Sequence, residues 1–328
     1  MNRKLKVGII GLGVGMHHLN CFLNNKNCEI VSVCDFKVSK LKQIKSKIPN
    51  LKITTNSDNI IKNREIDLVC ISTYDNFHAK QVIKSIKQNK HVFVEKPICT
   101  NFLEYKKIKK ELKKRPKVRL SSNFILRTSP QFIKISKMIK NKKFGKIYFI
   151  AGEYNYGRLS KITKGWRGGI KNYSVTHGGG LHIIDLALSL IKEKPTKVTA
   201  MGNNISTKET KFKNNDITTS NIKFKNNLIL NVTSNFGCVM PHHHTFKIYG
   251  TKLSFIQDFK NAEIFSSRLE NKKTEHMNKK YLNKNKRIVL ENFIDSIIYK
   301  DEKSAIITSK DVMNSMAISL AIEKSIKS

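Results

Sequence analysis

Short apolar runs alternate with helix-length amphipathic segments over the first third of the chain. Residues 5–10 form an apolar run that ends in glycines, as a strand buried on both faces of a sheet would. Further strands are predicted at 29–35, 66–72 and 91–95. Helices are predicted between them, at 17–25, 37–47 and 77–89. This alternation predicts an α/β domain with a doubly wound parallel sheet.

The pattern changes after about residue 121, where strand-like runs follow one another across short polar links. Strands are predicted at 146–153, 197–203, 218–225, 228–236 and 245–250, with a hairpin turn at Asn226–Asn227. Helices are predicted at 131–142, 179–191, 288–299 and 309–326, and the polar span 267–287 predicts an exposed loop. This half predicts an α+β domain with a large, mostly antiparallel open sheet.

Two domains are therefore expected in the 328 residues, at roughly 100–200 residues for each domain. The first is expected over 1–121 and the second, which would bind the substrate, over 122–328. The terminal helix of the second is a candidate for packing back on the first.

A glycine-rich turn, Gly11-Leu12-Gly13-Val14-Gly15, follows the first predicted strand and precedes a helix. Such glycines allow a tight turn and let backbone N–H groups, including that of Val14, approach a pyrophosphate at a helix N-terminus. The third glycine stands one residue early, because Met16 occupies its usual place. The turn predicts a Rossmann-type dinucleotide site. The alternative is a glycine-rich turn without a ligand.

Asp35 ends the second predicted strand, where a carboxylate can accept hydrogen bonds from both ribose hydroxyls. A carboxylate there repels a 2′-phosphate, so NAD is expected in preference to NADP, although Lys37 weakens that preference. The alternative role of Asp35 is to cap a helix.

Polar residues also follow the strands predicted at 66–72 and 91–95, at the sheet edge where ligands bind. After the first of these strands come Ser72, Thr73, Asn76 and His78, which are expected to bind the cofactor. Asn76 is also a candidate N-cap, and His78 either faces the cofactor or covers the helix start. Glu95-Lys96-Pro97 follows the other strand. Proline excludes the helical region for Lys96, so its ammonium is expected beyond the sheet edge, oriented by Glu95, where it would stabilise developing alkoxide charge.

The run from His177 to Asp185 contains three glycines, Gly178, Gly179 and Gly180, and a helix is predicted to start near Gly180. His182 and Asp185 then share one helix face. An imidazole suits removal of a hydroxyl proton, and Asp185 would hold its tautomer or contact substrate hydroxyls. The alternatives are a helix-capping histidine and a metal site of His177, His182 and Asp185; no metal is the expected outcome. The run 242–244 is three histidines at a strand start, whose side chains would alternate between faces.

Composition adds a strong positive charge. The chain has 62 Lys plus Arg against 24 Asp plus Glu, a net charge of +38. Clustered cations would indicate nucleic acid, but the lysines are spread throughout, so no specific nucleic-acid partner is expected. The positive field would still attract an anionic cofactor or substrate. The six cysteines lack metal-ligand spacing and no run reaches the ~18 apolar residues of a membrane span, which favours a cytoplasmic protein.

These motifs, in this order, resemble the Gfo/Idh/MocA family of oxidoreductases. The resemblance rests on the glycine turn, Glu95-Lys96-Pro97, Asn123 to Arg127, Gly165-Trp166-Arg167, and the Gly-x-His-x-x-Asp pattern at 180–185. It implies that Lys96 is the catalytic lysine, that His182 is the acid/base, and that Asn123 lies near the nicotinamide. It further implies a homodimer or homotetramer formed through the open sheet, and a substrate pocket with the following candidates: Arg127, Tyr156, Trp166, Arg167 and Tyr173.

Two positions depart from the family pattern: Gly178 replaces an aspartate common four residues before the histidine, and Leu253 replaces a glycine. The main hypothesis is NAD-dependent hydride transfer between nicotinamide and a secondary alcohol of a sugar, cyclitol or sugar nucleotide. Gly178 motivates the alternative of a non-catalytic, dinucleotide-responsive regulator. The high charge motivates a third hypothesis, a nucleic-acid binder.

Overall fold

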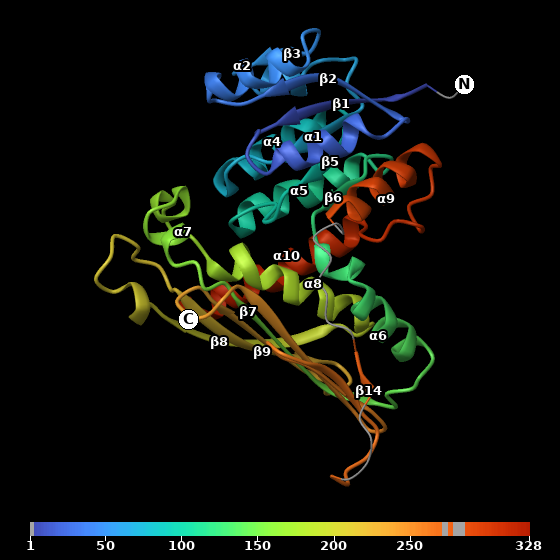
Figure 1. Cartoon of the computed structure of the whole chain (residues 1–328), viewed down its shortest axis with the longest axis vertical. Helices are drawn as coiled ribbons and strands as arrows, with labels where there is room; N and C mark the ends of the chain where they lie inside the picture. Colours follow the sequence, from blue (N-terminus) through green and yellow to red (C-terminus); the bar gives the residue numbers. More distant parts are fainter. Residues whose placement is uncertain (1–2, 271–274, 278–285) are drawn as a thin grey trace. The chain divides into compact units, whose positions relative to one another are not determined.

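The computed structural model describes residues 3–270, 275–277 and 286–328, and the predicted loop 267–287 falls largely outside them (Figure 1). The chain divides into two compact units. Unit 1 is Met1–Phe124 with Lys284–Met316, and unit 2 is Ile125–Asn283 with Ala317–Ser328. The segment 284–316, expected in the second domain, thus belongs to the first unit.

Unit 1 contains a parallel sheet in the order β3-β2-β1-β4-β5-β6. Its strands are β1 (Leu5–Ile10), β2 (Cys28–Cys34), β3 (Lys52–Thr54), β4 (Leu68–Ile71), β5 (His91–Val94) and β6 (Leu120–Ser122). Its helices are α1 (Gly15–Leu23), α2 (Val38–Lys47), α3 (Asp58–Ile61), α4 (Asp75–Lys87), α5 (Phe102–Lys114) and α9 (Lys286–Ile298). The predicted doubly wound fold is confirmed. The strand order reverses between β1 and β4, and ligands of such sheets bind beyond the carboxyl ends of the strands at this point.

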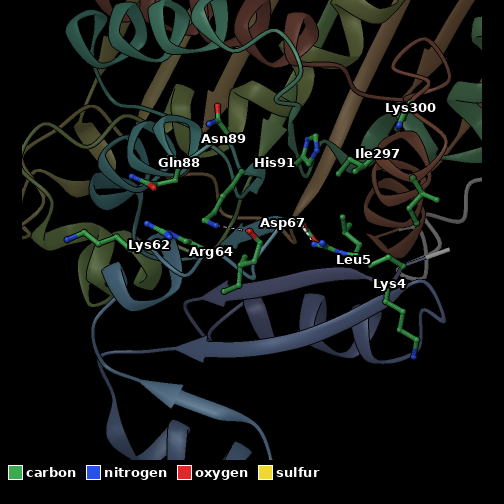
Figure 2. A pocket seen from close by; sticks show the side chains of 14 residues that line it. Lys4, Leu5, Lys62, Arg64, Asp67, Gln88, Asn89, His91, Ile297 and Lys300 are labelled. Carbon is green, nitrogen blue, oxygen red and sulfur yellow. Dashed lines mark hydrogen bonds and ion pairs between the residues drawn. The ribbon is translucent and has the colours of Figure 1, made fainter. Parts of the chain in front are cut away.

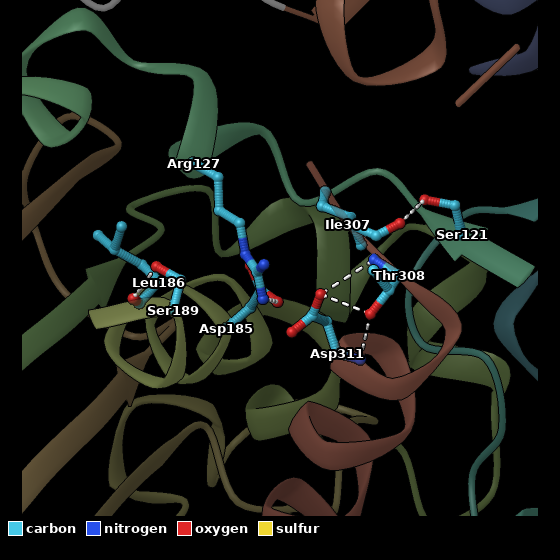
Figure 3. A network of polar contacts seen from close by, with 8 residues as sticks. All are labelled: Ser121, Arg127, Asp185, Leu186, Ser189, Ile307, Thr308 and Asp311. Carbon is cyan, nitrogen blue, oxygen red and sulfur yellow. Dashed lines mark hydrogen bonds and ion pairs between the residues drawn. The ribbon is translucent and has the colours of Figure 1, made fainter. Parts of the chain in front are cut away.

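The segment 284–316 is attached to unit 1 by contacts that are remote in sequence. Phe293 of α9 packs on Phe93 of β5, with ring centroids 5.8 Å apart. The Ser121 hydroxyl donates to the carbonyl of Ile307 at 3.0 Å (Figure 3), and the Ser309 hydroxyl accepts from the amide of Leu120 at 2.9 Å. Sequence periodicity carries no information on pairings of this separation.

Unit 2 contains an eight-stranded sheet in the order β14-β13-β12-β11-β7-β10-β9-β8. Its strands are β7 (Ile147–Asn155), β8 (Pro195–Asn203), β9 (Ile217–Phe224), β10 (Ile229–Asn235), β11 (His243–Gly250), β12 (Ser254–Gln257), β13 (Ala262–Phe265) and β14 (Glu275–His276). Among the described strands of this sheet, only β7 and β10 pair in parallel, so the predicted mostly antiparallel sheet is confirmed. Asn227 has φ 65° in the tight turn between β9 and β10, which confirms the hairpin.

Helices of unit 2 are α6 (Pro130–Lys140), α7 (Ser160–Thr163), α8 (Leu181–Leu190) and the end of α10 (Ser309–Lys327). Helix α8 lies over one face of the sheet (Figure 1). Gly152 of β7 permits this close packing, because a Cβ there would lie 2.5 Å from a methyl group of Ile183. The burial of β9 alternates strictly, so one face of the sheet is in the core and the other is exposed.

Candidate active site

The glycine turn in unit 1 is shaped by the end of β4. Gly11 has φ +92°, and a Cβ on it would lie 2.4 Å from the carbonyl oxygen of Ser72. Its amide donates to the carbonyl of Cys34 at 2.7 Å. Gly15 begins α1, and a Cβ there would lie 3.3 Å from the Ser72 side chain. Glycine is therefore required at position 11 by the backbone and favoured at 15 by close packing.

Gly13 differs from these two glycines, because a Cβ there would meet nothing within 4 Å. It stands just before Val14, the N-cap of α1. The first amides of a helix lack intrahelical partners and, with the helix dipole, favour an anion. The open space before these amides fits the pyrophosphate of a dinucleotide.

Filling that space should weaken cofactor binding without harming the fold. We expect Gly13→Val to raise the Kd for NAD+ at least about tenfold, or ~1.4 kcal/mol, with the melting temperature unchanged. Gly169→Val is the matched control, because Gly169 also has nothing within 4 Å of its Cβ position. Isothermal titration calorimetry of both variants would show this, and equal NAD+ affinity in the two would contradict the pyrophosphate assignment.

Asp35 is almost fully buried at the end of β2. Its carboxylate accepts from the amides of Leu12 at 2.7 Å and Lys37 at 2.8 Å. The ammonium of Lys40 lies 3.6 Å from it, an ion pair that the sequence did not reveal. Asp35 thus ties the glycine turn to β2, and each oxygen retains a lone pair for a ribose hydroxyl. Lys40 partly offsets the charge that would repel a 2′-phosphate.

Polar residues after β4 are mostly engaged within unit 1. The Thr73 hydroxyl donates to Gln81 at 2.8 Å. His78 is fully buried, and its ring nitrogens lie 2.7 Å and 3.1 Å from the carbonyl oxygens of Pro97 and Thr73. These contacts favour the structural alternative for His78, a link between two loops. The expected N-cap at Asn76 is wrong, because α4 begins at Asp75 after Tyr74.

Glu95 lies just after β5 and connects two other side chains. It accepts from His18 Nε2 at 2.8 Å and from Asn123 Nδ2 at 2.9 Å. Burial alone would raise the pKa of Glu95, but the bond to His18 and the charge of His18, the bond to Asn123 and the charge of Lys96 lower it to about 2. Glu95 is therefore ionised at neutral pH, and it fixes Asn123 and faces the positive charge of Lys96.

The depressed pKa of Glu95 makes its contribution to stability pH-dependent. The contribution is complete above the unfolded pKa near 4.5 and is lost as the pH falls toward 2. We expect Glu95→Gln to lower the free energy of unfolding by about 3 kcal/mol at pH 7, with the difference from wild type shrinking below pH 4.5. Urea unfolding at several pH values measures it, with the exposed Glu65→Gln as control. A pH-independent difference would contradict this role.

His182 stands at the second position of α8 in unit 2, after a π-helical turn at Thr176–Gly180. It is 8% exposed, and its ring stacks on Tyr154 with centroids 5.9 Å apart. The His244 ring lies near both of these rings, with centroids 4.9 Å from Tyr154 and 6.5 Å from His182. These aromatic contacts fix the plane of the imidazole.

Asp185 pairs with Arg127 (Figure 3). Arg127 donates from Nε and Nη2 to the two carboxylate oxygens, each at 2.7 Å, and Asp185 is fully buried. This forked geometry is strong and directional. The pair joins the segment before α6 to α8. The expected roles of Asp185 in catalysis and of Arg127 in substrate binding stay predictions.

The glycines at 178–180 accommodate aromatic rings, whereas the sequence suggested close approach of a ligand. A Cβ at Gly178 would lie 2.1 Å from the Tyr173 hydroxyl, and one at Gly179 would lie 2.3 Å from the Tyr154 ring. The Tyr173 hydroxyl thus occupies the space of any side chain at 178, one turn before His182. His177 is buried, with Nδ1 2.6 Å from the hydroxyl of Ser319, which favours a structural role.

The histidines at 242–244 alternate as expected for a strand start. His242 and His244 contact the Tyr154 ring, with centroids 5.1 Å and 4.9 Å from it. His243 instead packs on Phe259 at 5.0 Å. No group of three or more potential ligands in the described residues is placed to hold a metal ion. His242 and His244 were not expected near His182, although the period of two in a strand could have placed them on one face.

A cavity of about 720 Å³ lies elsewhere in unit 1, at the amino ends of β1, β4 and β5 (Figure 2). Six of its 14 lining residues are Lys or Arg: Arg3, Lys4, Lys62, Arg64, Lys90 and Lys300. The Lys90 ammonium donates to the carbonyls of Asn63 and Ile66 at 2.6 Å and 2.7 Å. Because α4 and α9 end here, cations also complement their dipoles. The cavity is at the sheet edge opposite the glycine turn and is not the dinucleotide site.

Comparison with known proteins agrees with the two folds described above. Residues 5–124 match the family model described as "Oxidoreductase family, NAD-binding Rossmann fold", and residues 132–256 match the GFO/IDH/MocA C-terminal domain. The chain belongs to the GFO/IDH/MocA oxidoreductase family. The resemblance proposed from the motifs is therefore confirmed.

Relatives of this GFO/IDH/MocA protein include myo-inositol 2-dehydrogenase of Thermotoga maritima, 27% identical over 43% of this chain and 42% of that protein. The chain thus matches less than half the length of this curated relative. Two solved structures share the fold over 99% of this chain. Myo-inositol 2-dehydrogenase from Lactobacillus plantarum has a TM-score of 0.82, 18% identity and 98% coverage of its own chain. Scyllo-inositol dehydrogenase from Lactobacillus casei, with bound NAD(H) and scyllo-inositol, has a TM-score of 0.81, 16% identity and 97% coverage of its own chain.

The described helices of this family member include none with the length and apolar character needed to span a bilayer.

Proposed function

We propose that this protein oxidises a secondary alcohol of a sugar-like molecule with NAD+ and reduces the corresponding ketone in reverse. The observation that carries the proposal is the pair of family domains with Lys96 beyond the carboxyl end of β5 and His182 at the start of α8. Relatives named as inositol dehydrogenases support a polyol substrate. NAD is preferred to NADP in this proposal, because the Asp35 carboxylate lies at the end of β2.

A dinucleotide held by the glycine turn and Asp35 would supply C4 of its nicotinamide as the hydride acceptor. The imidazole of His182 takes the hydroxyl proton as the C–H bond breaks, and the ammonium of Lys96 donates a hydrogen bond to the same oxygen and stabilises its developing charge. The Glu95 carboxylate interacts electrostatically with Lys96 and holds Asn123, which is proposed to border the nicotinamide. The Tyr173 hydroxyl, one turn before His182, is proposed to contact a substrate hydroxyl.

The regulator hypothesis rested on the missing carboxylate at Gly178, and the Tyr173 hydroxyl at that place supplies a polar group instead. A panel of cyclitols, free sugars and sugar derivatives, incubated with protein and NAD+, tests the proposal. We expect reduced nicotinamide to form, as seen by absorbance, with at least one member. NAD+ binding without turnover of any member would favour a regulator, and no dinucleotide binding would remove both proposals.

We further propose that the protein forms a dimer or tetramer through the exposed face of the unit 2 sheet, and that it is located in the cytoplasm. Sedimentation velocity would test the first of these.

A further inference from the structure

The cavity at the amino ends of β1, β4 and β5 contains no residue that the redox proposal uses (Figure 2). Residues from four separate stretches of unit 1 line it, within 3–5, 62–67, 88–91 and 297–300. Its volume of about 720 Å³ falls in the range of roughly 300–1,000 Å³ that is typical of small-molecule sites. The cavity can therefore accept a ligand of its own.

Lysine and arginine are more frequent around this cavity than in the chain as a whole. They make up 62 of the 328 residues, about one in five, which would place about three of them among 14 lining residues. The cavity has six, and each of the four stretches contributes at least one. The general abundance of lysine in the sequence accounts for only part of this charge.

The negative charge beside these cations is smaller. Asp67 is the one carboxylate among the described lining residues, and it accepts from Arg3 at 2.6 Å and from the amide of Lys6 at 2.9 Å. Glu65 and Asp301 lie next to cavity residues in sequence, but neither lines the cavity. Helices α4 and α9 also end here, and each C-terminus is equivalent to roughly half a negative charge. Six cations against these groups leave an excess of about four positive charges, which favours a bound anion.

Lys90 and His91 each offer a hydrogen-bond donor to this cavity. Lys90 is almost fully buried, and its ammonium donates to two carbonyls at 2.6 Å and 2.7 Å and keeps a third N–H. Burial lowers the pKa of Lys90 and the charge of Asp67 opposes that change, so a further anion nearby would also favour the ammonium form. Burial and the charge of Arg119 lower the pKa of His91 to about 4, so its ring is neutral at pH 7. Its Nδ1 accepts from the Arg119 amide at 3.1 Å, which leaves the ring N–H on Nε2 as a donor.

Four other cations of the cavity are exposed and make no ion pair with a described residue: Lys4, Lys62, Arg64 and Lys300. Figure 2 shows Lys62 and Arg64 on one side of Asp67, and Lys4 and Lys300 on the other. A guanidinium can bind two phosphate oxygens in a forked geometry, and each lysine can meet a further oxygen. Because cations stand on both sides, the cavity suits an anion that carries several charges along its length.

We propose that this cavity binds a polyphosphate anion, either free or as part of a nucleotide, at a site separate from the dinucleotide turn. Arg64 and Lys300 bind its charged oxygens from opposite sides, and Lys90 and His91 donate to it from the start of β5. A bound anion would join β4 and β5 to the end of α9, and it would thereby stabilise the attachment of 284–316 to unit 1. The inference does not depend on the proposed redox function.

Isothermal titration calorimetry of the full chain at about 0.15 M salt, with and without saturating NADH, tests this proposal. The probes are inorganic phosphate, tripolyphosphate, AMP and ATP. We expect one equivalent of tripolyphosphate or ATP to bind, with a Kd at least about tenfold below that of phosphate or AMP, and with the same Kd when NADH is present. The comparison of tripolyphosphate with ATP distinguishes a free polyphosphate from a nucleotide as the preferred form.

Arg64→Gln combined with Lys300→Gln should raise this Kd at least about tenfold, with the melting temperature of the unliganded protein unchanged. Lys109→Gln combined with Lys113→Gln is the matched control. It removes the same charge from two exposed positions of α5 outside the cavity and should change the Kd less than about twofold. Equal weakening in the two double variants, or many weak equivalents instead of one, would show a general attraction of polyanions and overturn the site. Displacement of the polyphosphate by NADH would place it at the glycine turn and overturn the site as well.

Discussion

Lys96→Met is expected to lower kcat/KM for the alcohol substrate by about 10²- to 10³-fold while NAD+ affinity changes by less than about threefold. The methionine keeps the length of the side chain but cannot donate to the developing alkoxide, and a single lost donor of this kind costs about 3–4 kcal/mol in the transition state. Steady-state kinetics with fluorescence titration of NADH separates the two effects. Lys62→Met, at the opposite edge of the same sheet, is the control.

His182→Ala should lose about 10²- to 10⁴-fold in kcat, because it removes the proton acceptor. If both residues act on one oxygen, the double variant should lose much less than the product of the two single losses. Fully multiplicative losses would contradict joint action of Lys96 and His182, and loss of NADH binding in Lys96→Met would assign the lysine to the cofactor instead.

Arg127→Met is expected to destabilise unit 2 by about 3–5 kcal/mol, because it leaves the Asp185 carboxylate charged and fully buried without its partner. Urea unfolding followed by tryptophan fluorescence measures this loss, since the chain has one tryptophan, Trp166, in unit 2. Any loss of activity should follow the loss of structure.

The double variant Arg127→Met with Asp185→Leu separates a structural ion pair from a substrate ligand. Replacing both charges removes the uncompensated carboxylate, so stability should recover most of the loss. If Asp185 supports catalysis only through its ion pair with Arg127, the double variant should regain part of the activity. If stability recovers but activity stays as low as in the single variants, Asp185 takes a direct part in the reaction.

Local patterns predicted much of this fold. Parallel strands buried on both faces are continuous apolar runs, so β1, β2, β4 and β5 were visible in the sequence. The hairpin at Asn227 was visible because asparagine tolerates positive φ. The three-residue strands β3 and β6 are too short to show a period, and they are placed by pairing with neighbours.

Long-range pairings are where sequence reasoning failed. The Arg127–Asp185 pair joins residues 58 positions apart, and no spacing rule predicts it. The glycines before His182 suggested an open ligand site, whereas side chains of Tyr154 and Tyr173 occupy that space. Attachment of residues 284–316 to unit 1 likewise depends on tertiary contacts. Motifs indicated the candidate site residues, and the packed structure showed which of them contact one another.

Transfer of deuterium tests the central claim most directly. A polyol substrate deuterated at the reacting carbinol carbon is incubated with the protein and NAD+, and the reduced dinucleotide is analysed by mass spectrometry. Direct hydride transfer predicts one deuterium in the nicotinamide of each reduced molecule and none released to solvent. Oxidised polyol with unlabelled NADH, or with no reduced dinucleotide, would contradict the mechanism.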